Sequence, residues 1–429
     1  MEIFVYADWI ETEPPLFIGT LRASRIRGKE HFSFCYDKTW LKSKYASQID
    51  PCLHLYSGEQ HAEDDKNFKI FLDSCPDRWG RLLMQRREAV IARIEGRRAN
   101  TLYETDYLLG VHDSFRMGAL RFCTEHGGNF LDDNDDNDDL AAPAMTSLAE
   151  LECAAQGIED KPDFDNPDYL KWLNMLISPG SSLGGARPKA SVRDVDGTLW
   201  LAKFPSRYDD YDIGLWEYLV YQMALDSGIN MAECKVQAIG SDHHIFLTKR
   251  FDRTDDGRRL QFTSAMTQLE YFDGNDDGAS YLELAEFLIQ NGSNTRADLA
   301  QLWRRMLFNI MVANSDDHLR NHGFIFDTTG WRLSPAYDIN STQHAHGLHL
   351  NIDDKDNALD IDLVFEVAEY FQLDVKTADK IYHQVAQAVS KWESLAKEAG
   401  IKRGERDLMR DSGRAHECSF FNHCRYACG

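Results

Sequence analysis

The sequence lacks both a stretch that could span a membrane and an excess of basic residues. No run of about 18 consecutive apolar residues occurs among the 429 residues, so we expect no membrane-spanning helix. Lys and Arg number 47 against 70 Asp and Glu, which gives a formal net charge of −23. Because nucleic acids and anionic membranes are bound through basic surfaces, we expect neither to bind this chain by itself.

The start of the chain and its cysteines both favour the cytoplasm. Residues 1–15 lack the basic segment followed by an apolar segment that is typical of a secretory signal peptide. The nine cysteines are an odd number and mostly isolated, which indicates reduced thiols rather than a disulfide framework. We therefore expect a cytoplasmic protein.

The sequence contains enough hydrophobic residues to form more than one core. Hydrophobic residues make up 43% of the chain and aromatic residues 11%, and the length favours two or three domains. The clearest break is the segment 126–147, where Asp and Asn alternate. It lacks the central Gly and terminal Glu of a calcium loop, so we interpret it as a solvated linker rather than an ion site.

Periodicity predicts strands before the break and mainly helices in the last third of the chain. β-type runs with near-alternate apolar residues occur at 2–10, 15–24, 31–37 and 51–58. Helices are predicted after Pro76, over 212–228 and over 295–314. The expected core residues of the last two are Leu215, Leu219, Met223, Leu225, Leu299, Leu302, Met306, Ile310 and Ala313.

The segment 314–340 has the layout of a phosphoryl-transfer site. Asp316 is followed five residues later by Asn321, and Asp338 follows a short apolar segment and a turn. In such sites one carboxylate takes the proton of the attacking hydroxyl, while an amide and a second carboxylate hold Mg²⁺. Asp316 is the preferred base, because Asp317 lies one residue too close to Asn321.

Two further side chains of this segment have open roles. His318 could act as a base, but a His in a tight loop is more often a structural donor to a carbonyl, which is the interpretation we prefer. Arg320 could neutralise the γ-phosphate or fasten the loop through a salt bridge, and the sequence favours neither.

Upstream segments supply what a phosphate site would still need. The loop 178–189 is rich in Gly and Ser, although it is not a Walker loop; its candidate phosphate-binding residues are Ser181, Ser182, Gly184 and Gly185. Lys203 lies in an apolar, strand-like run, and Glu217 follows fourteen residues later in a predicted helix. A strand lysine held by a helix glutamate is part of the kinase template.

Taken in order, these motifs resemble a known family. The segments SSLGGARPK (181–189), KRFDR (249–253), NSDDHLRN (314–321) and SPAYDI (334–339) together are similar to HipA, the serine/threonine-kinase toxin of bacterial type II toxin–antitoxin modules. The segment DSCPDRWGRLLMQRR (73–87) resembles the small subdomain before the kinase core of that family.

The resemblance implies an α+β fold, a bilobal protein-kinase-like domain behind a small β-rich amino-terminal subdomain. The implied boundaries are 1–125 for that subdomain, 126–147 for the acidic linker, 148–253 for the kinase N-lobe and 254–429 for the helical C-lobe. The implied cofactors are ATP and Mg²⁺.

The resemblance also implies roles for individual residues. Lys203 would bind the ATP phosphates, and residues 248–251, with Lys249 and Phe251, would form the adenine hinge. Asp316 would be the catalytic base, and Asn321 and Asp338 would bind Mg²⁺. Family members autophosphorylate a serine of the Gly-rich loop and so inactivate themselves; Ser182 matches that serine, with Ser181 adjacent.

The family's partner is a helix-turn-helix antitoxin that carries the DNA contacts, and its substrates include aminoacyl-tRNA synthetases. Two other functions stay open: a kinase-shaped co-repressor module with little phosphotransfer, and phosphorylation of a small molecule. The sequence departs from the family at Arg187-Pro188, at Asp317 and in the Cys/His-rich tail 416–429. For that tail we prefer a frayed chain end to a zinc site.

Overall fold

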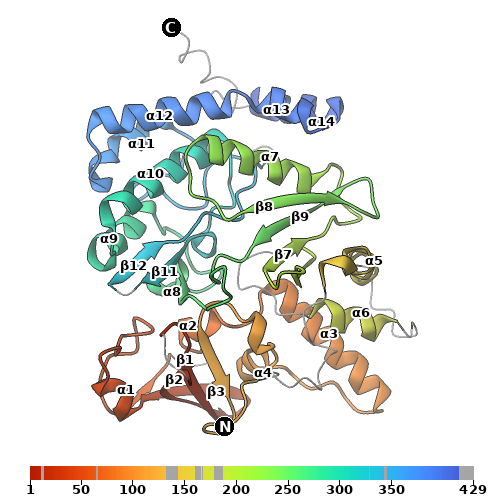
Figure 1. Cartoon of the computed structure of the whole chain (residues 1–429), viewed down its shortest axis with the longest axis vertical. Coiled ribbons are helices and arrows are strands. Elements are labelled where there is room, and N and C mark those ends of the chain that lie inside the picture. The colour runs from red at the N-terminus through yellow and green to blue at the C-terminus, as the bar shows by residue number, and fades with distance from the viewer. Residues whose placement is uncertain are drawn as a thin grey trace. The chain divides into compact units, whose positions relative to one another are not determined.

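The computed structural model describes residues 1–10, 14–63, 66–131, 144–159, 166, 168–177, 187–327, 329–342 and 345–414, except the side chains of Thr146 and of 411–414. The chain divides into two compact units (Figure 1). The first contains residues 1–207 and 252–263, and the second contains 208–251 and 264–429.

The first unit is built on a five-stranded antiparallel sheet with the strand order β4-β3-β2-β1-β5. Its strands are β1 (Glu2–Ala7), β2 (Leu16–Ile26), β3 (Lys29–Tyr36), β4 (Glu59–His61) and β5 (Leu120–Cys123). Arg27 and Gly28 connect β2 to β3 with φ angles of 53° and 81°. A two-residue hairpin with positive φ at both positions matches the twist of the strands, which explains the glycine there.

The first three predicted strands are confirmed, but the fourth is wrong. Residues 51–58 form turns and bends, and β4 begins only at Glu59. The carboxylate of Asp50 accepts the backbone N–H groups of Cys52 and Ile70, at 2.9 and 2.8 Å, which bends the chain away from the sheet. Leu53 is fully buried at this bend, so the apolar pattern reflects an anchored loop.

Helices and a second hairpin complete the described part of the first unit. The helices are α1 (Lys38–Lys42), α2 (Lys69–Leu72), α3 (Arg78–Ile94), α4 (Glu104–Leu109), η1 (Asp113–Phe115), η3 (Met145–Ser147), α5 (Leu148–Glu159) and α6 (Tyr169–Leu176). Strands β6 (Lys189–Arg193) and β7 (Leu199–Lys203) pair antiparallel. The predicted helix after Pro76 is α3, and Asp77 caps its first turn.

The second unit is mainly helical. Its elements are α7 (Ile213–Asp226), β8 (Cys234–Ala238), β9 (His244–Lys249), α8 (Ala265–Gln268), α9 (Tyr281–Asn291), α10 (Thr295–Met311), η4 (Leu319–Asn321), β11 (Gly323–Asp327), β12 (Gly330–Leu333), α11 (Ile361–Glu366), η5 (Ala368–Phe371), α12 (Val375–Val389), α13 (Trp392–Glu398) and α14 (Arg403–Arg414). β10 (Phe262–Ser264) lies where the chain passes from the first unit to the second. Figure 1 shows α7 beside the β8–β9 hairpin.

The core of the second unit follows most of the predicted apolar pattern. Leu299, Leu302, Met306 and Ile310 of α10 are completely buried. Leu225 of α7 is a correction, because it is 46% exposed while Met223, two residues earlier, is completely buried. Two residues correspond to about 200° around a helix, so Leu225 faces away from the core that Met223 contacts.

Candidate active site

The loop that carries Asp316 is fastened to the end of α10. The backbone N–H and the side-chain amide of Asn314 donate to the carbonyl and the side-chain oxygen of Asn309, at 2.8 and 3.2 Å. Ala313 adopts a left-handed conformation with φ 53°, which ends the helix and turns the chain into the loop. The position of the following residues is therefore set by a buried polar contact within the second unit.

Asp316 and Asn321 are joined across this loop. The side-chain amide of Asn321 donates to the backbone carbonyl of Asp316 at 2.7 Å. The Asp316 side chain is 68% exposed, so its carboxylate can reach a hydroxyl from solution. The other side-chain polar atom of Asn321, Oδ1, is buried and has no hydrogen-bond partner within the described part of the chain. A buried acceptor without a donor is costly unless a ligand or ion completes it.

Asp338 lines the same small pocket as Asn321. The pocket is bounded by Arg305, Asn309, Asn314, Asp317, Asn321, His322, Ala336, Tyr337, Asp338 and Ile339. Asp338 has a left-handed backbone with φ 54°, which is uncommon for a residue with a side chain although Asp tolerates it better than most. The amide of Asn340 donates to its carboxylate at 2.9 Å. The spacing of the motifs had assigned no role to Asn340.

These residues fit the Mg²⁺ that the sequence predicts. Mg²⁺ prefers oxygen ligands and is held by one or two carboxylates together with substrate phosphates. Asp338 supplies a carboxylate and Asn321 a buried amide oxygen without a donor. Among the residues that the structure describes, no group of three or more His, Cys, Asp or Glu could hold a metal ion.

Asp317, the alternative candidate for the base, is buried and stabilises the loop through hydrogen bonds. Its carboxylate accepts the Tyr281 hydroxyl at 2.7 Å and the backbone N–H of His349 at 2.7 Å. The side-chain amide of Asn309 also donates to that hydroxyl, at 2.9 Å. Burial raises the pKa of Asp317 to about 6, although both hydrogen bonds to the carboxylate oppose the rise. This geometry favours Asp316 as the base.

His318 does not have the structural role that we preferred for it. Its Nδ1 is buried without a hydrogen-bond partner in the described residues, and its Nε2 lies 3.8 Å from a carboxylate oxygen of Asp316. Burial lowers the pKa of His318, so the ring is neutral near pH 7. His318 therefore faces Asp316 rather than a carbonyl, and the expected carbonyl contact is wrong.

His322 is a buried residue that the sequence pattern did not single out. It lines the same pocket, and burial lowers its pKa to about 3, with Arg305 acting in the same direction. Neither ring nitrogen makes a hydrogen bond of normal geometry within the described residues, and a weak contact with the backbone of Asp317 opposes the fall of the pKa. Burial also lowers the pKa of Arg305 to about 10. In the sequence, the only feature that could have indicated His322 was its position directly after Asn321.

Arg320 makes the salt bridge that was one of its two expected roles. Its Nη2 lies 3.0 Å from a carboxylate oxygen of Asp273. The Tyr337 hydroxyl donates to the Arg320 carbonyl at 2.8 Å, and the Tyr337 ring stacks on Phe251 with centroids 5.2 Å apart. The last predicted hinge residue therefore contacts the segment that leads to Asp338.

The remaining hinge and phosphate residues are distributed over both units. Lys249 donates its backbone N–H to the carbonyl of Glu233 at 2.7 Å. Its ammonium lies 3.9 Å from the side-chain carboxylate of the same residue. Lys203 ends β7 in the first unit and is 9% exposed, as expected for a buried strand. Glu217 is buried on α7 of the second unit, so the Lys203–Glu217 pair stays a prediction.

Some predicted site residues lie outside the described residues. These are Ser181, Ser182, Gly184 and Gly185 of the Gly-rich loop and the Cys/His-rich tail 416–429. Their roles stay predictions from the sequence.

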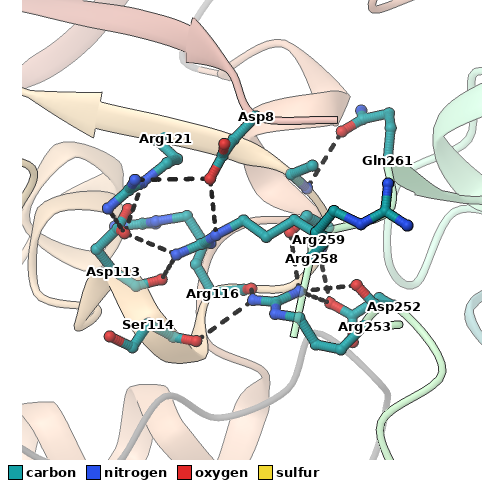
Figure 2. Close-up of polar contacts among 12 residues, drawn as sticks. Asp8, Asp113, Ser114, Arg116, Arg121, Asp252, Arg253, Arg258, Arg259 and Gln261 are labelled. Carbon is teal, nitrogen blue, oxygen red and sulfur yellow. Dashed lines mark hydrogen bonds and ion pairs between the residues drawn. The ribbon is translucent and has the colours of Figure 1, made fainter. Parts of the chain in front are cut away.

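Directly after the predicted hinge, the chain is fixed by a buried network in the first unit (Figure 2). The carboxylate of Asp252 accepts the backbone N–H of Gly118 at 2.8 Å. Arg253 donates to the carbonyls of Gly118, Ser114 and Arg116, at 3.1, 3.3 and 2.9 Å. Residues 252 and 253 are therefore attached to the segment before β5 within the first unit.

A second arginine extends this network. Arg259 donates to the carbonyl and the carboxylate of Asp113 at 2.9 and 2.7 Å, and its Nε lies 3.3 Å from Asp8 (Figure 2). Burial lowers the pKa of Arg259 and raises that of Asp8. Three side chains that are far apart in the sequence thus form one charged cluster.

Residues 181–392 match the family model of the HipA-like C-terminal domain. The chain carries a HipA-like C-terminal domain. This domain contains the predicted hinge, the Asp316 loop and Asp338.

Two curated relatives are named as putative kinases. A "Putative kinase" of Haemophilus influenzae is 29% identical over 181 residues, which cover 37% of this chain and 52% of that protein. The "Putative kinase Y4mE" of Sinorhizobium fredii is 23% identical over 248 residues, which cover 51% of each chain. The chain thus spans about half the length of these curated relatives.

The fold matches that of HipA from Shewanella oneidensis, solved with HipB and its operator DNA. The TM-score is 0.64 at 17% identity, over 96% of this chain and 94% of that chain. The predicted fold class, α+β and kinase-like behind a β-rich amino-terminal subdomain, is confirmed. In the described residues, the HipA-like chain has no helix with the length and apolar character needed to cross a bilayer.

Proposed function

We propose that this chain is an ATP- and Mg²⁺-dependent serine/threonine protein kinase of the HipA type. The observation that carries the proposal is the pocket shared by Asn321 and Asp338, with a buried amide oxygen that lacks a donor. Asp316 stands at the same loop with an exposed carboxylate. An exposed base beside a hard-oxygen metal site is the arrangement that phosphoryl transfer requires.

Each residue then has a defined task. The hydroxyl oxygen of a Ser or Thr attacks the γ-phosphorus, the bond to the bridging oxygen breaks, and ADP leaves. Asp316 accepts the hydroxyl proton, and Asn321 keeps the backbone of Asp316 in place. Mg²⁺, held by Asn321 and Asp338, would neutralise charge on the phosphates. Lys203 binds those phosphates, and residues 248–251 receive the adenine.

The cellular role belongs to the same proposal. The kinase is the toxin of a toxin–antitoxin module, acts on an aminoacyl-tRNA synthetase or a similar translation factor, and inactivates itself by autophosphorylation at Ser182. A helix-turn-helix antitoxin is its partner, which the similarity to a HipA solved with HipB and operator DNA supports. We place this role in the cytoplasm, as the mostly isolated cysteines of the sequence indicate.

Incubation with γ-labelled ATP and Mg²⁺ tests the proposal. We expect label on Ser182, located by mass spectrometry, and on an added bacterial translation extract. Asp316→Asn should abolish both signals, whereas Asp374→Asn, an exposed helix-cap acid far from the site in sequence, should keep them. A wild-type protein that transfers no label but still binds an antitoxin would instead support the co-repressor alternative.

A further inference from the structure

Two lysines face each other across the β6–β7 hairpin of the first unit. Lys189 is the direct partner of Lys203 in the strand pairing. The neighbouring pair is hydrogen-bonded, because Phe204 donates its N–H to the carbonyl of Pro188 at 2.9 Å. Lys189 and Lys203 therefore form a non-hydrogen-bonded pair, in which opposite side chains come closest.

This arrangement is costly unless one of the charges is compensated. Like charges directly opposite on a sheet destabilise the pairing. Lys189 is 2% exposed and Lys203 9%, so water screens their repulsion only weakly. The lysine predicted to bind phosphates thus has a second, buried lysine as its direct strand partner.

Asp77 supplies the compensating charge from the amino-terminal part of the unit. Its Oδ2 lies 2.9 Å from the Lys189 ammonium, and both side chains are almost completely buried. Its Oδ1 accepts the N–H of Gly80 and caps α3. The Trp79 indole donates to the Lys189 carbonyl at 3.2 Å, so the start of α3 holds Lys189 at two points.

We propose that Asp77 is a positioning residue for the nucleotide phosphates. By pairing with Lys189, the direct strand partner of Lys203, it fixes the strand register that presents Lys203 to the phosphates. This inference rests on the proposed kinase function. It gives the PDRWG segment (76–80) of the amino-terminal subdomain a direct influence on ATP affinity.

A double-mutant cycle separates this role from a merely structural one. Asp77→Asn keeps the helix cap, because Asn caps about as well as Asp, but it removes the charge. Lys189→Met keeps the unbranched stem and also removes the charge. Each single variant should raise the KM for ATP about tenfold, because it breaks the buried ion pair that holds the strand beside Lys203. The double variant should return the KM to within about twofold of wild type.

The KM and kcat must respond differently. Asp316, Asn321 and Asp338 are unchanged in these variants, so kcat at saturating ATP should stay within about twofold of wild type. The matched control is Asp374→Asn, which also removes one charge from a helix-capping acid; its side chain accepts the N–H of Thr377 at 2.7 Å and is exposed. It should leave the KM unchanged.

Several results would overturn the inference. These are an unchanged KM in Asp77→Asn, a lower kcat with unchanged KM, or a double variant as impaired as the single ones. If Asp77→Asn fails to fold by circular dichroism, Lys189→Met decides, because an unchanged KM there contradicts compensation. A wild-type protein without phosphotransfer or ATP binding would instead refute the kinase function itself.

Discussion

At the scale of single residues, Asp338 and Asp316 should separate nucleotide binding from transfer. Asp338→Asn should weaken Mg²⁺-dependent ATP binding at least about tenfold, because it removes the carboxylate that we propose as a ligand of the ion. Asp316→Asn should leave binding within about twofold and lower the rate by about 10²- to 10⁴-fold, as expected for a lost general base. Isothermal titration calorimetry with and without Mg²⁺ measures the first effect. Equal ATP affinity in wild type and Asp338→Asn would contradict the metal assignment.

Asp317 predicts a distinct pH dependence of stability. Burial raises its pKa from the ordinary value of 3.8 to about 6, so the folded state binds its proton more tightly than the unfolded state. The contribution of Asp317 to the free energy of unfolding is therefore fully present below about pH 4. It is lost as the pH rises through about 6. Relative to wild type, Asp317→Asn should gain about 2–3 kcal/mol of unfolding free energy between pH 4 and 7.

Urea denaturation of both proteins at several pH values measures this difference. Groups common to both, His322 among them, cancel in the comparison. A difference that does not vary with pH would show that Asp317 titrates normally in the folded protein.

The contrast between these two acids shows what local sequence can predict. The spacing of Asp316 and Asn321 is a property of one loop, and the bond between them confirms that the loop brings them together. The environment of Asp317 comes from Tyr281 and His349, which are 36 and 32 residues away. Burial by such distant partners has no signature in the neighbouring sequence.

At the scale of elements, the segment 252–263 should stabilise the first unit through Arg253. This side chain is 9% exposed, donates to three carbonyls and forms an ion pair with Asp252 at 2.6 Å (Figure 2). Arg253→Met should cost about 3–5 kcal/mol, because it breaks a buried ion pair and removes three hydrogen bonds to carbonyls. The free energy of unfolding in guanidinium chloride measures the loss.

Arg258→Met is the matched control for this prediction. Arg258 lies in the same segment, but it is 57% exposed and pairs with Asp256, which is 62% exposed. An exposed ion pair contributes at most about 1 kcal/mol, so the variant should be nearly as stable as wild type. Equal losses in both variants would mean that the buried network contributes no more than a surface contact.

Element predictions succeeded where one period dominated the apolar pattern. The stripe of α10 is the clearest example, since four of its predicted core residues are completely buried. The pattern failed at 51–58, where Asp50 forms hydrogen bonds with the backbone and overrides the alternation. It also failed at Leu225, where an apolar residue near a helix end does not face the core.

At the scale of the whole molecule, each of the two units is built from two separate stretches of the chain. Strand β5 pairs with β1 across more than a hundred residues, and residues 252–263 join the first unit although residues 208–251 belong to the second. The network around Asp252 and Arg253 explains the second case, because both side chains form hydrogen bonds with backbone groups of 114–118. No composition shift marks that segment, so the domain boundaries drawn from the sequence stay predictions.

The charge of the whole chain leads to the last prediction. With a formal net charge of −23, the protein should not bind duplex DNA by itself at physiological salt, because phosphate contacts need a basic surface. Together with a basic helix-turn-helix partner it should bind the partner's operator, and the affinity should fall steeply with salt as counterions are released. Electrophoretic mobility shifts at about 50 and 200 mM salt, with each protein alone and combined, measure this. Salt-sensitive DNA binding by this chain alone would contradict the division of labour, in which the kinase carries the chemistry and its partner the DNA contacts.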